Sequence, residues 1–315
     1  MKVAVFGAGA VGSYLGSRLT AARADVHLIA RGAHLEALRE RGLTLITPDG
    51  VTTSPVWATD DPASIGPVDL VLFCVKSYDT EEVARSLAPL VGPTTGVLSI
   101  QNGIDNEPKI AAVIGPGHVL GAAVYVLASV ESPGVVRSGR ARVLVGELEP
   151  GRPSKRVLEI VDLAQTGGLD ATAVADVRIA KWEKYTVLVA FSAVSAATQL
   201  PIGDIRRAPA AVAMLRGIMT EAWTVGRKLG IPLGDGLVDQ QIELLLSQAN
   251  SAGASLRHDL MTGHRMELEA LQGTLSRLGH ETGIPTPWTD AAYAILQPWA
   301  IRNERLAADR TTIPA

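Results

Sequence analysis

The chain has 315 residues, of which 47% are hydrophobic and 19% are charged, with a formal net charge of −3. This length suits two domains, and the near-neutral charge without a basic patch argues against a nucleic-acid partner. No apolar run reaches the roughly 18 residues of a membrane span, so no membrane partner is expected. The one cysteine, Cys74, excludes an internal disulfide, and no signal peptide is recognisable, so we expect a cytoplasmic protein. Cys74 itself reads as a buried small hydrophobe, with a reactive thiol as the lesser alternative.

Short apolar strands alternate with helices in the first hundred residues. We expect strands at 2–6, 25–30, 70–75 and 96–100, and helices at 10–22 and 80–90. This alternation predicts a parallel, doubly wound sheet. Residues 119–148 read as strands joined by Gly and Pro turns, which we expect to extend that sheet in antiparallel fashion.

Helical patterns follow EPGRPS at 149–154. The expected helices are 154–166, 176–198, 208–229, 235–248, 266–281 and 287–302. The fold class is therefore an α/β N-terminal Rossmann-type doubly wound sheet plus an all-α C-terminal domain. We assign 1–170 to the first domain and 171–315 to the second, and expect the tail RTTIPA to be frayed.

The sequence GAGAVG at 7–12 matches the dinucleotide-binding fingerprint. Gly7 permits the tight turn, Gly9 allows backbone N–H groups to approach a pyrophosphate, and Gly12 lets the helix pack against the strand. The pyrophosphate then lies at the helix N-terminus, which favours an anion. The predicted cofactor turn comprises Gly7, Ala8, Gly9, Ala10, Val11 and Gly12. The alternative is a glycine-rich turn with no ligand.

The residue at the end of the second strand distinguishes NAD from NADP. An NAD site places Asp or Glu there to hold the ribose 2′-hydroxyl. Here the residue is Arg31, and no acid lies between Asp25 and Glu36. Since a guanidinium suits a phosphate, we expect NADP(H). A solvent-facing arginine without a ligand is the alternative.

Two polar residues follow predicted strands directly. Lys76 comes after LVLFCV and Asn102 after GVLSIQ. The carboxyl ends of strands in a doubly wound sheet are where ligands bind, so both are candidate ligand contacts. Turn chemistry at Asn102-Gly103 is an equally good explanation of the asparagine.

Lys184 lies within the apolar helical stretch KWEKYTVLVAFS. A lysine on a half-buried helix face has either a lowered pKa or a partner. The alternative is a snorkelling lysine, whose stem packs on the apolar face while its ammonium stays in water. Lys181 is flanked by fewer apolar residues and is expected to be a surface charge. A second polar cluster spans 254–271, where the spacing of His258 and His264 matches no zinc motif, so no metal site is expected.

With these residues in order, the chain resembles the ketopantoate reductase family (2-dehydropantoate 2-reductase) over nearly its whole length. The most specific part of the resemblance is KWEKY at 181–185 together with S-x-x-x-D-x-x-x-G-x-x-x-E at 255–267. GAGAVG, Arg31, the Lys76 strand end and QNG at 101–103 complete it.

The resemblance implies a role for each matching residue. Lys184 would be the proton donor, Asn102 would touch cofactor and substrate, and Glu267 would reach the nicotinamide ribose. Lys76 and Arg31 would serve the cofactor. The implied substrate contacts are Asn102, Lys184, Ser192, Ser255 and Asp259. The implied reaction is NADPH-dependent reduction of 2-dehydropantoate to pantoate, in pantothenate and coenzyme A biosynthesis.

The chain departs from the family pattern at three positions. Leu188, Ser192 and Ile202 stand where the family usually has asparagines. Fewer amides leave a more apolar site, which loses selectivity for a polar substrate. A paralogous NADPH-dependent reductase of another 2-oxo acid or ketone is therefore the alternative, and a non-catalytic dinucleotide-binding regulator is the third reading. The expected partner is a small-molecule 2-oxo acid, and a homodimer is compatible with the sequence.

Overall fold

The computed structural model describes residues 1–312, with side chains through 309. The chain forms two compact units, and each has its own core. The first comprises 1–101 and 105–180, and the second comprises 102–104 together with the chain from Lys181 on.

The first unit is built on an eight-stranded sheet of order β12-β11-β8-β7-β6-β1-β2-β5. All neighbouring strands pair in parallel except β8 and β11, which are antiparallel. The predicted doubly wound α/β sheet is confirmed. The strands are β1 (Lys2–Phe6), β2 (Asp25–Ile29), β5 (Trp57–Thr59), β6 (Val68–Phe73), β7 (Val91–Ser99), β8 (Val119–Tyr125), β11 (Arg142–Glu147) and β12 (Asp170–Ala173).

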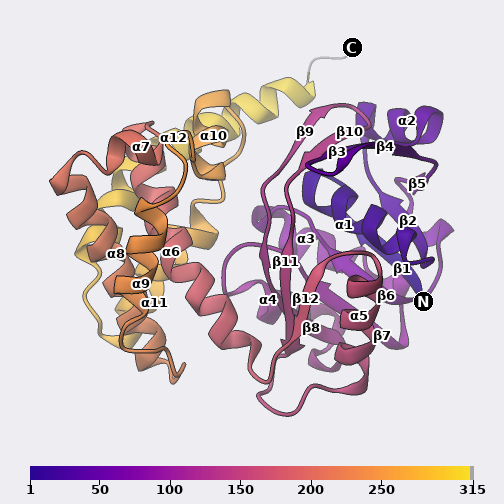
Figure 1. Cartoon of the computed structure of the whole chain (residues 1–315), viewed down its shortest axis with the longest axis horizontal. Helices are drawn as coiled ribbons and strands as arrows, with labels where there is room; N and C mark the ends of the chain where they lie inside the picture. The colour runs from indigo at the N-terminus through magenta and orange to yellow at the C-terminus, as the bar shows by residue number, and fades with distance from the viewer. Residues whose placement is uncertain (313–315) are drawn as a thin grey trace. The chain divides into compact units, whose positions relative to one another are not determined.

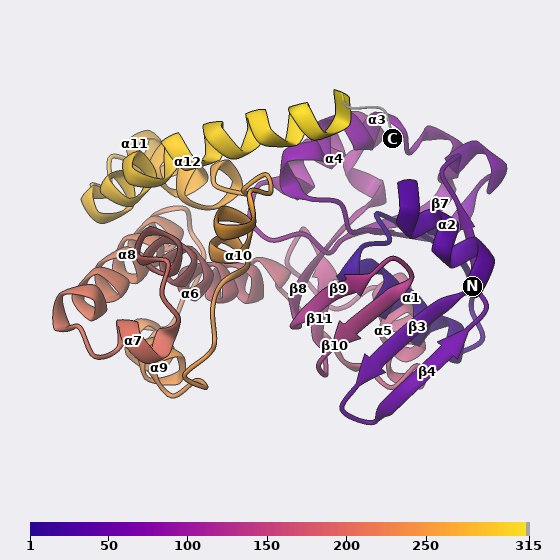
Figure 2. The same cartoon turned by 90° about the horizontal axis from the view of Figure 1, so that it is seen from above.

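Side chains of the central strands are buried alternately on two faces. In β1, Val3 and Val5 join one core cluster, whereas Ala4 and Phe6 join another. Helices α1 (Ala10–Ala21) and α5 (Lys155–Thr166) cover the first face, and α3 (Thr80–Arg85) and α4 (Asn106–Ile114) cover the second (Figure 2). Burial on both faces explains why these strands are continuous apolar runs in the sequence.

A second, four-stranded sheet corrects the expectation for 119–148. Only β8 and β11 extend the large sheet, whereas β9 (Ala128–Ser132) and β10 (Val135–Ser138) form the sheet of order β4-β3-β10-β9 (Figure 1). Strands β3 (Leu43–Thr47) and β4 (Gly50–Ser54) supply its other half, and α2 (Gly32–Arg41) precedes them. Val136 of β10 and Leu45 of β3 are buried in the α1-side core, which gives this small sheet its own apolar face.

The second unit confirms the predicted helical domain, because every regular element the structure describes beyond Lys181 is a helix. The π-helix η5 continues into α11 without a break. The helices are α6 (Val177–Thr198), α7 (Ile202–Ile205), α8 (Pro209–Lys228), α9 (Leu237–Leu246), α10 (Ser255–Thr262), η5 (Glu269–Gly273), α11 (Thr274–Thr282) and α12 (Pro287–Thr312).

The ends of the two units differ from the boundaries proposed from sequence. Residues 170–173 form β12, which pairs with β11, so the first unit extends past 170 and divides from the second after Ala180. At the C-terminus, α12 includes residues 310–312 of the tail expected to be frayed. The last residues of that tail, 313–315, lie outside the described part of the chain.

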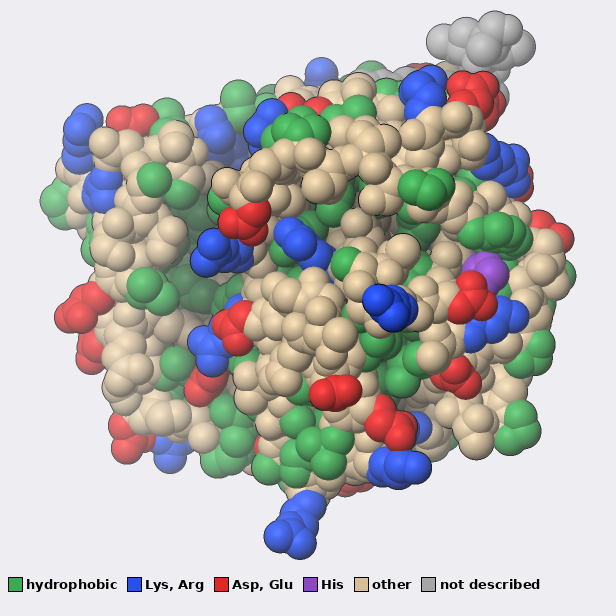
Figure 3. Space-filling view, turned by 45° about the vertical axis from the view of Figure 1, so that its right-hand side comes forward, with side chains coloured by type: hydrophobic (Ala, Val, Ile, Leu, Met, Phe, Trp, Pro, Cys, Tyr) green, Lys and Arg blue, Asp and Glu red, His purple; other side chains and the backbone are tan. Residues whose placement is uncertain are grey.

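The surface carries charges of both signs. In the face drawn in Figure 3, Lys and Arg side chains alternate with Asp and Glu, in keeping with the net charge of −3. Within residues 1–312, no helix combines the length and the apolar character that crossing a bilayer requires.

Candidate functional site

The glycine turn joins β1 to α1 in the geometry that the fingerprint requires. Gly7 has φ +92°, and a Cβ there would lie 2.9 Å from the backbone nitrogen of Val75. A Cβ on Gly12 would collide with the carbonyl oxygen of Gly7. Both positions are therefore restricted to glycine by the fold itself, with or without a ligand.

Gly9 differs because nothing lies within 4 Å of the position its Cβ would take. Its backbone is exposed, and it is the N-cap residue of α1, with no side-chain cap hydrogen bond. The first-turn N–H groups of Ala10, Val11 and Gly12 have no partner within the helix. Open space over a glycine, in front of these N–H groups, fits the phosphates of a dinucleotide.

Arg31 is the N-cap residue of α2, directly after β2 and Ala30. Its side chain is exposed and, within the described part of the chain, pairs with no acid. The nearest acid along the helix, Glu36, is also exposed. Arg31 is therefore better suited to a phosphate of a ligand than to a ribose hydroxyl, which needs a hydrogen-bond acceptor.

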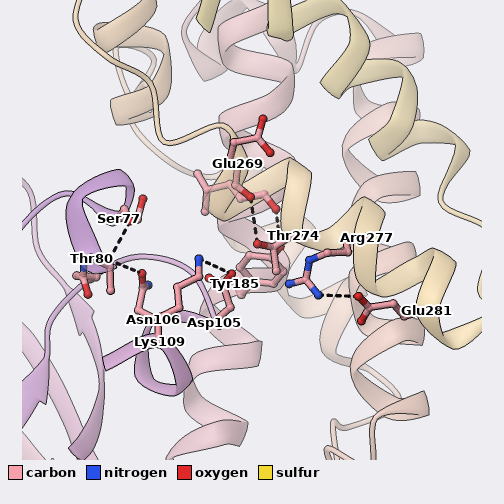
Figure 4. Close-up of polar contacts among 12 residues, drawn as sticks. Ser77, Thr80, Asp105, Asn106, Lys109, Tyr185, Glu269, Thr274, Arg277 and Glu281 are labelled. Atoms are coloured by element: carbon pink, nitrogen blue, oxygen red, sulfur yellow. Dashed lines mark hydrogen bonds and ion pairs between the residues drawn. The ribbon is translucent and has the colours of Figure 1, made fainter. Parts of the chain in front are cut away.

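Lys76 lies just after β6 and is exposed at the start of the turn Ser77–Asp79. A buried network supports this turn (Figure 4). Its centre is Thr80, whose hydroxyl lies 2.9 Å from the Ser77 carbonyl oxygen and 3.1 Å from Oδ1 of Asn106. The side-chain amide of Gln101 donates to Thr80 Oγ1 at 2.7 Å. The segment after β6 is thus fixed to Gln101, which follows β7, and to Asn106 at the start of α4.

Lys184 and Asn102 lie together in the second unit. The Lys184 ammonium donates a hydrogen bond of 2.7 Å to Oδ1 of Asn102. Burial lowers the pKa of Lys184 from 10.5 to about 8, with a further lowering by Lys181, while Glu267 acts in the opposite sense. A lysine whose pKa is lowered toward the physiological range is suited to proton transfer.

Lys181 is not the surface charge expected from sequence, since only 7% of it is exposed. It lies one turn before Lys184 on α6, and the stem of a lysine packs well against apolar neighbours. Glu267 is likewise 7% exposed. The second unit therefore gathers two lysines and one carboxylate around the same helix face, a charge arrangement that sequence spacing alone did not predict.

Ser255 and Asp259 lie one turn apart on α10. Ser255 is exposed at the first residue of the helix, whereas Asp259 is 8% exposed. Asn303 of α12 holds the other end of α10, because its side-chain amide donates to the carbonyl oxygens of Asp259 at 3.0 Å and His264 at 2.9 Å. Of the pair, Ser255 is therefore the one exposed to solvent.

The three positions that depart from the family pattern have different environments. Leu188 is half-buried one turn after Lys184. Ser192 is fully buried, and its hydroxyl lies 2.6 Å from the Leu188 carbonyl oxygen. The Ser192 hydroxyl is thus hydrogen-bonded inside the helix bundle, and a substrate contact by this residue stays a prediction. Ile202 is also fully buried, so Leu188 is the one of the three positions that is partly exposed.

Sequence reasoning missed the π-helix η5 and the residues that fix it. Tyr185 is 1% exposed, and its hydroxyl donates to the carbonyl oxygen of Leu271 at 2.6 Å. Gln272 is fully buried, and its amide donates to the carbonyl oxygen of Val189 at 2.8 Å. The only available signal was a tyrosine and a glutamine within otherwise apolar faces.

The structure offers no arrangement typical of a metal or thiol enzyme among its described residues. No group of three or more His, Cys, Asp or Glu side chains there could hold a metal ion. Burial raises the pKa of the Cys74 thiol above its usual range, so this cysteine is kept as the thiol and is a poor nucleophile.

Comparison with known proteins identifies the family. The model of "Ketopantoate reductase PanE/ApbA" matches residues 3–150, and that of its C-terminal domain matches 176–300. The chain belongs to the ketopantoate reductase PanE/ApbA family. It is therefore an oxidoreductase of this family, as the sequence resemblance indicated. A 2-dehydropantoate 2-reductase of Mesorhizobium japonicum is 32% identical to it, over 96% of this chain and 99% of the relative.

Solved structures of the ketopantoate reductase family have the same fold. A PanE/ApbA family ketopantoate reductase from Ralstonia eutropha JMP134 is 34% identical, with a TM-score of 0.89, covering 96% of this chain and all of that one. A D-mandelate dehydrogenase, solved with NADH and anilino(oxo)acetate, is 22% identical with a TM-score of 0.88, covering 96% of this chain and 99% of that one. The latter likeness is one of fold alone.

Proposed function

We propose that this protein reduces the ketone of a 2-oxo acid with NADPH, and that Lys184 is the proton donor. The observation that carries the proposal is the hydrogen bond between Lys184 and Asn102, at a lysine whose pKa is lowered to about 8. The protein that carries this lysine belongs to the ketopantoate reductase family, and its glycine turn is intact.

The residues of the first unit are suited to bind the cofactor. The turn from Gly7 to Gly12 would hold the pyrophosphate, and Arg31 the 2′-phosphate, with Lys76 as a further cation. The family resemblance adds Asn102 as a contact to cofactor and substrate, and Glu267 at the nicotinamide ribose. Bound NADPH supplies the hydride that reduces the ketone carbon.

Lys184 then has two tasks at the ketone oxygen. Its ammonium stabilises the negative charge that develops there, and it gives the proton that completes the alcohol. Asn102 accepts a hydrogen bond from the same ammonium and so holds it in one orientation. Ser255, on the exposed first turn of α10, is the proposed contact for the substrate, with Asp259 supporting it.

Two substrates are proposed. 2-Dehydropantoate, leading to pantothenate and coenzyme A, is supported by relatives named for that activity. A less hydroxylated 2-oxo acid is supported by Leu188, which provides no hydrogen bond one turn from Lys184. We place the reaction in the cytoplasm, on the evidence of the single cysteine.

A panel of 2-oxo acids assayed with NADPH tests the proposal. Lys184→Ala should lower kcat by about 10²- to 10⁴-fold, the usual contribution of a positioned acid, while NADPH affinity measured by fluorescence titration stays near that of the wild type. NADPH binding without turnover on any 2-oxo acid or ketone would instead favour a non-catalytic regulator.

A further inference from the structure

Two consecutive hydrogen bonds connect Tyr185, the residue after Lys184, to the backbone of Glu267. The Tyr185 hydroxyl donates to the carbonyl oxygen of Leu271 at 2.6 Å. The N–H of Leu271 donates in turn to the carbonyl oxygen of Glu267 at 3.2 Å. Tyr185 follows Lys184 on α6, so this chain joins the helix of the lysine to the segment that carries the carboxylate.

The segment that Tyr185 contacts is the π-helix η5. The N–H of Gly273 donates to the carbonyl oxygen of Leu268 at 3.0 Å, which is the wide spacing of a π-turn. The Thr274 hydroxyl adds a bond of 3.0 Å to the carbonyl oxygen of Glu269 (Figure 4). Such wide turns are rare and occur where surrounding contacts hold them, often at functional sites.

Gln272 provides a second link between η5 and α6. Its amide nitrogen donates to the carbonyl oxygen of Val189 at 2.8 Å and to the Ser192 hydroxyl at 3.0 Å. Gln272 and Tyr185 are both buried, so neither bond is exchanged for water. The π-helix is therefore fixed to α6 at two adjacent residues, Leu271 and Gln272.

The groups that act on Lys184 come from three segments of the second unit. Lys181 on α6 opposes its positive charge, Glu267 before η5 favours it, and Asn102 accepts its hydrogen bond. Glu267 is the single carboxylate among them. How near the carboxylate lies to the ammonium depends on where η5 is held.

We propose that Tyr185 is a positioning residue, whose hydroxyl holds η5 against α6 and thereby sets the place of the Glu267 carboxylate beside the Lys184 ammonium. The inference rests on the proposed function in taking Lys184 as the proton donor. Tyr185 itself touches neither substrate nor cofactor in this account. It acts through Leu271 and Glu267.

The test measures the ionisation of Lys184 directly in the protein without substrate or dinucleotide. The rate at which cyanate carbamoylates Lys184, followed by peptide mass spectrometry from pH 6 to 11, gives the titration midpoint. Glu267→Gln should move the midpoint to lower pH by about one pH unit, the usual effect of removing a neighbouring opposite charge. Tyr185→Phe should move it in the same direction by part of that amount.

The double variant decides whether Tyr185 acts through Glu267. Tyr185→Phe combined with Glu267→Gln should titrate like Glu267→Gln alone, because the carboxylate is already gone. Thr186→Val is the matched control, since it removes another buried hydroxyl of α6, one that bonds only the Trp182 carbonyl oxygen within the helix. It should leave the Lys184 midpoint at the wild-type value.

A wild-type midpoint in Tyr185→Phe, or a further shift in the double variant, would overturn the inference. If Tyr185→Phe does not fold, Gln272→Met removes the other link to α6, and its midpoint must fall below that of the wild type. Because no turnover is measured, a chain without reductase activity still reports on Tyr185. Loss of the proposed function and loss of this inference are therefore distinguishable.

Discussion

The Lys184 ammonium donates a 2.7 Å hydrogen bond to the side-chain oxygen of Asn102, a residue 82 positions earlier in the chain. An amide oxygen accepts this bond without adding a charge, so it orients the ammonium while burial keeps the pKa of Lys184 at about 8. Asn102 thus sets the orientation of the proposed proton donor, whereas burial sets its pKa.

The rate of ketone reduction should be nearly constant below pH 8 and fall about tenfold per pH unit above it. The pKa of Lys184 is lowered from 10.5 to about 8, so the ammonium that gives the proton is lost as the pH rises through that value. Steady-state kcat/KM with saturating NADPH from pH 6 to 10 checks this. Lys184→Arg, slower throughout, should show no such fall. A wild-type rate unchanged up to pH 10 would contradict the assignment.

Asn102→Asp should move that alkaline limb to higher pH. The replacement keeps the shape of the side chain but places a carboxylate against the ammonium, which raises the pKa of Lys184 by about one to three pH units. The rate at pH 7 should change much less than the position of the limb. Asn102→Ala is the control, because it removes the acceptor without adding charge. Coincident pH profiles for Asp and wild type would show that the two side chains are apart in solution.

Gly9→Ala and Gly12→Ala should separate ligand binding from folding. A Cβ on Gly9 meets nothing within 4 Å, whereas one on Gly12 meets the carbonyl oxygen of Gly7. We therefore expect Gly9→Ala to keep the wild-type Tm and to lose NADPH affinity, since the methyl group occupies the proposed phosphate position. Gly12→Ala should lower Tm by several degrees, as expected for about 1–3 kcal/mol of overpacking. Unchanged NADPH affinity in Gly9→Ala would place the dinucleotide elsewhere.

Arg31→Asp should reduce the preference for NADPH over NADH by at least about tenfold. A charge-assisted hydrogen bond contributes about 1.5–3 kcal/mol, and the carboxylate would in addition repel the 2′-phosphate. The ratio of kcat/KM values for the two cofactors is the measurement. Arg41→Asp, at the other end of α2, makes the same change of charge and should leave the ratio alone. Equal constants for both cofactors in the wild type would refute the NADP assignment.

Leu188→Asn should improve kcat/KM for 2-dehydropantoate by about fivefold, the equivalent of one restored hydrogen bond of about 1 kcal/mol. The residue is half-buried one helical turn, about 5–6 Å, from Lys184. Leu188→Ala enlarges the same space without an amide and serves as the control. If the wild type already turns over 2-dehydropantoate efficiently and Leu188→Asn does no better, the family asparagine is dispensable at this position.

The elements that were predicted from sequence are those with a strong local signal. Strand β1 and helix α1 followed from a buried apolar run and the glycine spacing, and the helical second unit followed from periodicity. Strand β12 was missed because DATA at 170–173 is short and only its pairing with β11 makes it a strand. Strands were expected within 119–148, but the second sheet formed by β9 and β10 was missed, because β3, the parallel partner of β10, lies far away in the sequence.

The features of the candidate site likewise fall into those with a local sequence signal and those that depend on tertiary contacts. The glycine turn, Arg31 and Lys184 could be chosen from residue type and local context. The burial of Ser192 and Lys181 could not, because a helix pattern does not reveal which polar residue faces another helix. The π-helix has no sequence signature, since it depends on contacts from Tyr185 and Gln272.

The second unit is assembled from two separate stretches of chain, 102–104 and the part from Lys181 on. A chimera that takes only the C-terminal half of a relative would receive that relative's counterpart of the Lys184 helix. It would keep Asn102 and the rest of the tripeptide from the host chain. Grafts made to transfer substrate preference among these reductases should therefore exchange the tripeptide Asn102–Ile104 as well. Recombination at Ala180 alone would pair the proposed proton donor with a hydrogen-bond acceptor from another protein.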